Sequence, residues 1–182
     1  MRRILDLNFS IIWFKSIFGI FLGLSGCVGV APGITPITGF ELERYLGKWY
    51  EIARLDHSFE RGLENVTAEY SLRSDGGVTV VNKGYSRRDD DWKMVEGKAY
   101  FVSDENVAHL KVSFFGPFYG SYVIFELEQK GYDYAFVTSH KKSYLWLLSR
   151  SPYVDQEVID KFLQTARKFG FQTSDLIFVE QS

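Results

Sequence analysis

Eight β-rich stretches follow one another along most of this chain, and only short turn clusters separate them. The turn clusters contain Gly, Pro, Asp, Asn or Lys and are too short for helical crossovers, which is typical of antiparallel hairpins. The longer connection over residues 57–65 is expected to form a lid. The expected strands cover residues 47–56, 66–73, 78–86, 92–102, 108–115, 119–128, 132–139 and 144–149.

Hairpin-linked strands leave two exposed sheet edges unless the sheet closes on itself. A closed barrel of about eight strands either holds one small ligand or is filled by its own side chains. Aromatic residues make up 17% of the 182 residues, which favours sheet and argues against a helical bundle. We therefore predict an all-β, eight-stranded antiparallel up-and-down barrel, although the pattern alone also allows a two-sheet sandwich.

The hydrophobic period changes to that of a helix after the last strand. The apolar residues with helical spacing are Ile159, Phe162, Leu163, Ala166 and Phe169. We expect this C-terminal α-helix to pack on the outside of the barrel. A short apolar run over residues 176–179 is expected to add a ninth strand.

Residues 1–26 have the organisation of a secretory signal peptide. Arg2 and Arg3 precede an uncharged apolar run over residues 16–24, which is about half the roughly 20 residues that a membrane span needs. The run is therefore expected to be removed as part of a signal and not to cross the bilayer.

Cys27 is the only cysteine and follows this run directly, in the sequence LSGC. The sequence resembles the bacterial lipobox, which implies cleavage before Cys27, lipidation of its thiol and firm membrane attachment. By the same resemblance, Val28 in the next position favours the outer membrane. Residues 28–38 contain two Pro and two Gly, and residues 27–39 are expected to form a lipidated tether, followed by the barrel domain over residues 40–182. An uncleaved leader with an incidental cysteine is the alternative.

Several function classes do not fit the composition. The net charge of −2, without a basic run, argues against nucleic-acid binding, and a single cysteine excludes a disulfide framework or a Cys-based zinc site. His57, His109 and His140 lack the spacing of metal ligands. Asp56, His57 and Ser58 are adjacent in sequence, which does not produce the geometry of a catalytic triad. We therefore expect no enzyme activity, no cofactor and no metal.

Two motifs at opposite ends of the expected sheet carry a family resemblance. YLGKWYEIAR covers residues 45–54, and YLWLLSR covers residues 144–150. Together they resemble the two strongest signatures of the lipocalin family, and residues 40–179 are most similar to the lipidated bacterial lipocalins of the outer membrane. The family fold is an eight-stranded barrel with a C-terminal helix outside it. A third signature, usually Thr-Asp, is Leu127-Glu128 here, which leaves the register of the seventh strand open.

The resemblance implies structural roles for three residues. The indole of Trp49 would close the floor of the barrel, and Arg150 would lie across it in a cation–π contact. Gly47 would let the backbone approach closely where a short N-terminal helix crosses that floor.

Alternation from an inward Arg150 places Leu148, Trp146 and Tyr144 inside the barrel, and Ala135 and Val137 are the better choice for the seventh strand. The resemblance supplies further inward positions. The expected ligand-binding residues are Tyr70, Asn82, Val112, Phe114, Tyr122, Val137, Tyr144 and Trp146. This mostly apolar wall with a few polar groups favours an elongated apolar ligand with one polar head group.

The expected function is that of a lipid-binding protein, anchored through Cys27 and facing the periplasm, which holds a fatty acid or lysophospholipid for storage or transport in the cell envelope. A homodimer is left open. The alternative is a structural or interaction lipoprotein with a filled barrel. A third hypothesis is an enzyme that acts on a bound lipid through Tyr70, Tyr122 or Glu51, but nothing in the sequence pairs these groups with a base.

Overall fold

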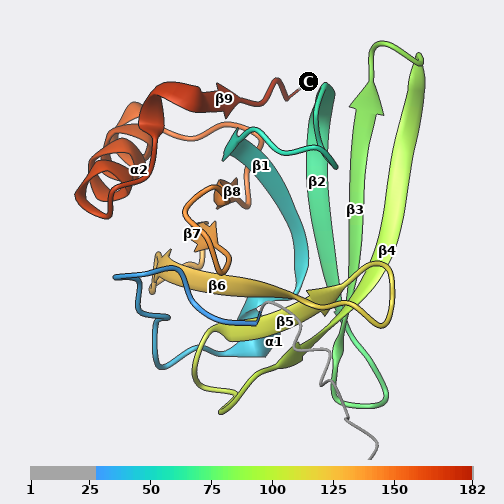
Figure 1. Cartoon of the computed structure of the whole chain (residues 1–182), viewed down its shortest axis with the longest axis vertical. Helices are drawn as coiled ribbons and strands as arrows, with labels where there is room; N and C mark the ends of the chain where they lie inside the picture. Colours follow the sequence, from blue (N-terminus) through green and yellow to red (C-terminus); the bar gives the residue numbers. More distant parts are fainter. Residues whose placement is uncertain (1–27, 182) are drawn as a thin grey trace, which may run out of the picture.

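The computed structural model describes residues 28–181, so the expected signal peptide and Cys27 lie outside the described residues. Figure 1 shows a single sheet wrapped into a barrel with one helix beside it. The elements are α1 (Leu42–Tyr45), β1 (Gly47–Leu55), β2 (Leu63–Leu72), β3 (Val78–Ser86), β4 (Asp91–Phe101), β5 (His109–Ser113), β6 (Gly120–Leu127), β7 (Tyr134–Thr138), β8 (Leu145–Ser149), α2 (Gln156–Lys168), a 3₁₀ turn η1 (Thr173–Asp175) and β9 (Leu176–Phe178).

Antiparallel pairing closes the barrel. Each strand from β2 to β8 pairs with the next, β8 pairs with β1, and β1 also pairs with β2, while β9 adds to β1 on the outside. This confirms the predicted eight-stranded barrel and removes the sandwich alternative. The lid is shorter than expected, because β2 begins at Leu63 and leaves residues 56–62 as the connection.

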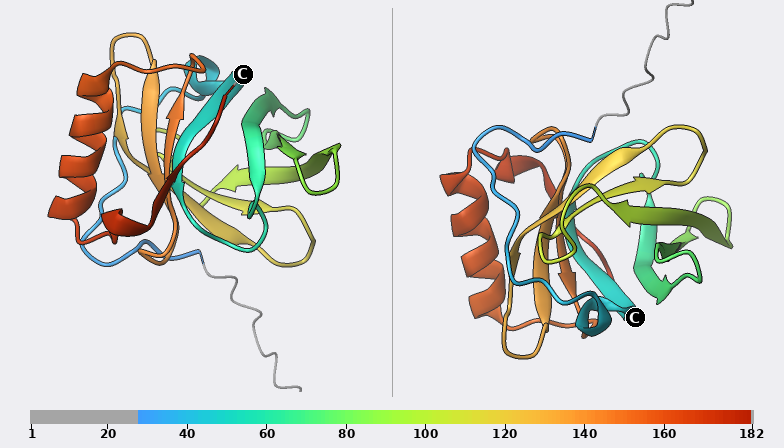
Figure 2. Two further views of the ribbon diagram at one scale, coloured as in Figure 1. Left: turned by 90° about the horizontal axis from the view of Figure 1, so that it is seen from above. Right: turned by 90° about the horizontal axis from the view of Figure 1, so that it is seen from below.

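Two hydrophobic cores lie on either side of the β7–β8 wall. Side chains of Ala135, Val137 and Leu148 point into the barrel, whereas Phe136 and Leu147 belong to an outer core. The helix α2 covers this outer core, as Figure 2 shows, and the Phe136 and Phe162 ring centres are 5.0 Å apart. The inward register expected for the seventh and eighth strands is therefore the one that the structure has.

Residues 28–39, which belong to the expected tether, lie along the barrel wall. The Ala31 amide donates to the Ser139 carbonyl at 3.1 Å, and the Ile37 amide donates to the Ile124 carbonyl at 3.0 Å. Ala31 and Ile34 are buried in the outer core, because apolar residues alternate with the Gly and Pro residues that suggested a linker. Across residues 28–181, the structure has no helix of the length and apolar character that a membrane span requires.

Candidate functional site

The floor of the barrel is the end at which β1 begins, and it is built on the indole of Trp49. The ring is fully buried, its Nε1 donates to the Tyr45 carbonyl at 2.8 Å, and Arg150 Cζ lies 4.0 Å from the ring centre. Arg150 also donates to the carbonyls of Lys48 at 3.0 Å and Arg44 at 2.7 Å, and burial lowers its pKa. Desolvation strengthens such a cation–π contact, so this pair closes the floor.

Gly47 is required here for a reason other than the expected close approach. A Cβ at this position would meet only Arg150 Nη1, at an ordinary contact distance of 3.6 Å. The backbone, however, has φ of +90°, which L residues with a side chain rarely adopt. The conformation of the chain as it turns from α1 into β1 therefore demands the glycine.

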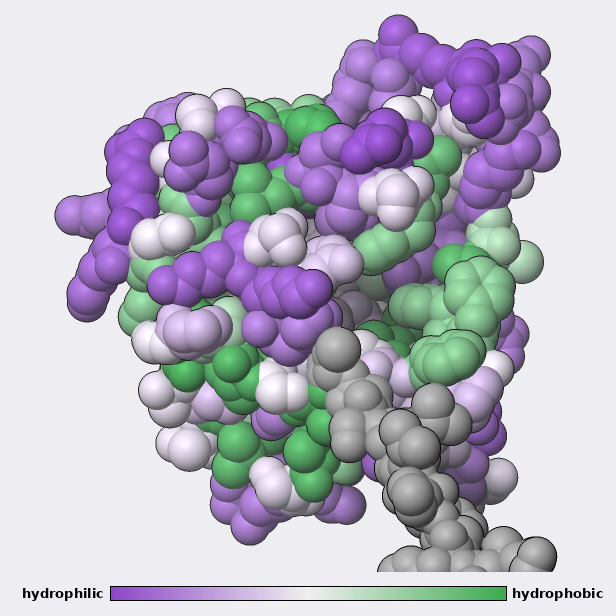
Figure 3. All heavy atoms as spheres, viewed as in Figure 1, coloured by the Kyte–Doolittle hydropathy of each residue, from purple (hydrophilic) through white to green (hydrophobic). Residues whose placement is uncertain are grey.

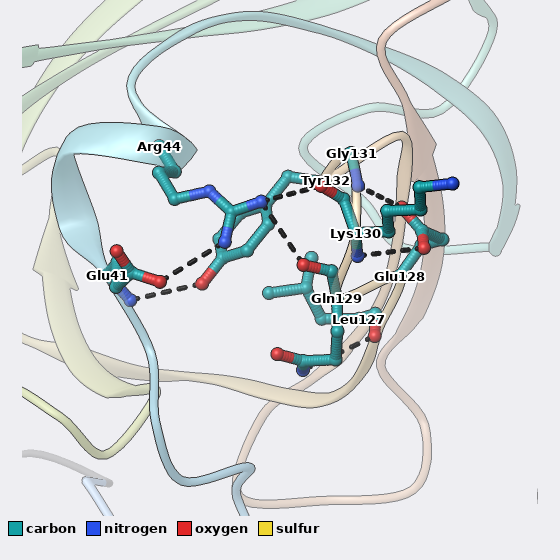
Figure 4. A network of polar contacts seen from close by, with 8 residues as sticks. All are labelled: Glu41, Arg44, Leu127, Glu128, Gln129, Lys130, Gly131 and Tyr132. Atoms are coloured by element: carbon teal, nitrogen blue, oxygen red, sulfur yellow. Dashed lines mark hydrogen bonds and ion pairs between the residues drawn. The ribbon is translucent and has the colours of Figure 1, made fainter.

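The short helix α1 is clamped onto the turn between β6 and β7, as Figure 4 shows. The Arg44 guanidinium lies 4.0 Å from the centre of the Tyr132 ring and donates to the carbonyls of Gln129 at 3.1 Å and Lys130 at 2.9 Å. The Glu41 amide donates to Tyr132 Oη at 3.1 Å. These contacts fix the helix that carries Tyr45 under the barrel.

Glu128 organises the same turn in place of the usual Asp of the family signature. Its carboxylate accepts hydrogen bonds from the amides of Gly131 at 2.6 Å and Lys130 at 2.9 Å, which lower its pKa. The longer side chain thus spans the longer turn without changing the register of β7.

Three tyrosine hydroxyls form a chain above the floor. Tyr45 Oη lies 2.7 Å from Tyr122 Oη, which lies 2.9 Å from Tyr70 Oη. Burial raises the pKa of all three phenols, so they stay protonated. The three hydroxyls carry three protons and the two hydrogen bonds use two of them, so one hydroxyl keeps a proton for another acceptor.

The mouth is the opposite end, where β1 ends, and the expected interior residues differ in burial. Tyr70 and Val137 are buried, whereas Val112, Phe114, Tyr122 and Trp146 belong to the interior cluster but stay half-exposed. These four side chains are therefore less completely covered than the core around Trp49.

Two other expected residues have different surroundings. Asn82 Oδ1 is buried and has no hydrogen-bond partner among the described residues. Tyr144 precedes β8 and stacks on Trp146, with ring centres 5.9 Å apart, so it extends the wall toward the mouth. The structure thus brings the eight expected residues to one interior and its rim.

Glu51, Arg54, His57, Glu60 and Trp146 form a buried polar cluster inside the mouth, which we call the mouth network. Arg54 Nη1 donates to Glu51 Oε1 at 2.6 Å, and Arg54 Nη2 donates to the Glu60 carbonyl at 2.9 Å. Glu60 Oε2 lies 3.1 Å from His57 Nε2 and accepts a hydrogen bond from Trp146 Nε1 at 3.2 Å. The network therefore ties the lid to β1 and β8.

The two carboxyl groups of the mouth network differ in ionisation. Burial, together with the nearby charge of Glu60, raises the pKa of Glu51 well above its usual value. Burial also opposes ionisation of Glu60, but hydrogen bonds from His57 and Trp146 outweigh it and keep the pKa of Glu60 below its usual value. Glu51 thus carries a proton more readily, and Glu60 carries the negative charge.

The sequence did not point to the mouth network as a site. A β-bulge in β1 between Glu51 and Ala53 shifts the pairing with β8, so Ile52 and Ala53 both face the outer core and Arg54 turns inward. The adjacent apolar residues Ile52 and Ala53 are consistent with this bulge, but Trp49 and Tyr50 are adjacent in the same way, so the sequence does not locate it. His57 also stacks on Phe59, with ring centres 4.0 Å apart, which places the lid over Trp146.

The adjacent Asp56 and His57 do not form a catalytic pair. The Asp56 carboxylate binds Arg61 at 2.7 Å, while the His57 ring faces Glu60. Two surface hollows lie outside the barrel, one on the solvent side of α2 around Lys161 and one beside the lid around Asp89. Neither hollow adds a group to the interior site.

Comparisons with known proteins agree with this architecture. A family model described as a lipocalin-like domain matches residues 40–181. Outer membrane lipoprotein Blc of Vibrio cholerae is 57% identical over 158 residues, covering 87% of this chain and 92% of that protein. Blc of Escherichia coli K12 is 52% identical over 149 residues, covering 82% and 84%.

Among solved structures, insecticyanin from the tobacco hornworm superposes with a TM-score of 0.68 at 23% identity, over 85% of this chain and 87% of that one, which shows a shared fold. The two Blc relatives are named as outer membrane lipoproteins, and the present chain shares this lipid-anchored location. The matched domain and these relatives together show that the chain belongs to the lipocalin family.

Proposed function

We propose that this lipid-binding lipocalin holds a fatty acid or lysophospholipid inside its barrel, for storage or transport in the cell envelope. The observation that carries the proposal is the graded burial of the inward side chains. Tyr70 and Val137 are buried, whereas Val112, Phe114 and Trp146 pack against the interior cluster and are only partly buried. Apolar side chains that the protein itself covers only in part favour contact with an apolar guest over contact with water.

The direction of binding follows from the two ends. An acyl chain gains about 0.8 kcal/mol for each buried CH₂ before the entropy costs of binding, so the apolar wall suits the chain. The charged groups of Arg54 and Glu60 lie at the mouth and suit a polar head group. The chain would therefore point toward the tyrosine hydroxyls, with the head group near the lid.

The proposal includes attachment through a lipidated Cys27 and a periplasm-facing barrel. Support comes from the LSGC sequence and from the location of the relatives. Residues 28–39 then hold the barrel against its anchor instead of letting it swing freely, since Ala31 and Ile37 bond to the wall.

Tryptophan emission tests ligand contact inside the barrel. Lysophospholipid and fatty acid are added to the purified lipidated protein, to Trp146→Phe and to the matched control Trp92→Phe, whose indole is exposed on β4. We expect a lipid-dependent change in the wild type and in the control, and its loss in Trp146→Phe.

Two outcomes would contradict the proposal. If lipid changes the emission of both variants equally, Trp146 does not contact the lipid. Native mass spectrometry that finds no copurified lipid and no uptake of envelope lipids would favour the alternative, a structural lipoprotein with a filled barrel.

A further inference from the structure

The turn between β5 and β6 exposes two large aromatic side chains close together. Phe115 is 77% exposed and Phe118 is 66% exposed, and the Phe118 amide donates to the Phe115 carbonyl at 3.3 Å within the same tight turn. On the face shown in Figure 3, hydrophobic side chains gather over this turn. Clustered exposed apolar groups of this kind mark a contact surface.

The charge around the turn suits a membrane surface. Residues 106–125 contain no Asp or Glu, and their one Lys or Arg residue is Lys111. Lys111 Nζ lies 5.4 Å from the centre of the Tyr119 ring. Aromatic rings beside a lysine have the composition of membrane interfaces, where anionic lipids attract cations.

The first described residue lies at the start of β5, the strand that leads to this turn. Val28, the first described residue, directly follows Cys27, and its backbone hydrogen-bonds the ring of His109 on β5. Phe115 is six residues farther along the same strand direction, roughly 20 Å at 3.3 Å per residue. A lipid anchor just before Val28 therefore keeps the turn within reach of the bilayer.

We propose that the β5–β6 turn docks on the bilayer that holds the lipid anchor, with Phe115 and Phe118 in the interfacial layer. Strands of an antiparallel meander alternate in direction, so β5 ends at the mouth, as β1 does. Docking through this turn brings the mouth and its lid to the lipid surface. The contact needs no ligand inside the barrel, so it can be tested independently of the lipid-carrier function.

A fluorescent label reports whether the turn enters lipid. Phe118→Cys and the control Tyr153→Cys are made in the full lipidated protein, in which Cys27 is acylated and the new thiol is the one available for an environment-sensitive NBD dye. Tyr153 is 71% exposed and lies just after Arg150, at the floor end. Both proteins are placed in vesicles of phosphatidylethanolamine and phosphatidylglycerol.

We expect the label at position 118 to shift its emission to the blue and to be quenched by nitroxide-bearing lipids, while the label at position 153 shows neither effect. Identical behaviour of the two labels would overturn the proposal. A blue shift at position 118 without quenching by the lipids would also overturn it, because a second protein copy would then cover the turn.

Discussion

The two buried carboxyl groups of the mouth network can each be replaced by an amide, and we expect the two substitutions to lower the stability by different amounts. Glu60→Gln removes the negative charge of a carboxylate that accepts a hydrogen bond from Trp146 Nε1 at 3.2 Å and lies 3.1 Å from His57 Nε2. Glu51→Gln replaces a carboxyl whose pKa is raised by burial and by Glu60, so the amide resembles the protonated form that this shift favours. Both substitutions replace a carboxyl by an amide of nearly the same shape, and the two side chains are buried to a similar extent.

Glu60→Gln is expected to lower the free energy of unfolding by about 2–3 kcal/mol, because hydrogen bonds to a charged group contribute roughly 1.5–3 kcal/mol and the amide keeps part of them. For a chain of this size that corresponds to a fall in Tm of roughly 5–10 °C. Glu51→Gln is expected to cost less than about 1 kcal/mol, since Arg54 keeps its hydrogen bond to the Glu60 carbonyl at 2.9 Å.

Urea unfolding of both variants at neutral pH, followed by tryptophan emission, measures the difference in the free energy of unfolding.

The dependence of stability on pH gives a second test. A carboxyl with a raised pKa keeps its proton in the folded state where the unfolded chain has lost it, so stability falls as pH rises from about 4.3 through the raised value. Glu51→Gln should lack this fall. Equal losses in the two variants, or an unchanged pH profile, would refute the assignment of the proton to Glu51.

Three further predictions concern the floor and the wall. Arg150→Met should lower the free energy of unfolding in urea by about 2–4 kcal/mol, because it removes the cation–π contact and two hydrogen bonds. Arg150→Lys should recover part of this loss. Full stability of Arg150→Met would contradict the role of the Trp49–Arg150 pair. Gly47→Ala should cost about 1–3 kcal/mol in the same assay, because φ of +90° strains any side chain. Gly97→Ala puts a Cβ at 2.7 Å from Phe114 Cδ1, so overpacking should cost about 1–3 kcal/mol and weaken lipid binding in a titration, whereas unchanged affinity would separate Phe114 from the ligand.

The barrel itself was predictable because its signals are local. Two-residue alternation and short polar turns locate each strand, and the helical period after Ser149 locates α2. The contact of Trp49 with Arg150 was predictable for a different reason, since both residues lie in motifs that resemble known signatures. Alternation from Arg150 then places Trp146 and Leu148 in the interior, as the structure has them.

The mouth network was not predictable because it depends on a change of register. The bulge after Glu51 reverses the inward and outward positions of β1, so strict alternation assigns Arg54 to the wrong side. The lid contacts are harder still, since Glu60 meets Trp146 across 86 residues of sequence. Nothing in the local pattern of residues 57–65 shows that His57 and Glu60 are buried.

The position of these charges explains how an apolar container can have a defined closed state. Buried ions lower the free energy only when their partners are complete, and an incomplete set is strongly unfavourable. Arg54 and Glu60 keep these hydrogen bonds only while the lid lies against β1 and Trp146. An apolar lid could slide over an apolar mouth with little change in free energy, whereas this one has a single favourable position. Opening the lid must therefore bring water or a polar head group to the mouth network, which couples access to the interior with the polar end of the guest.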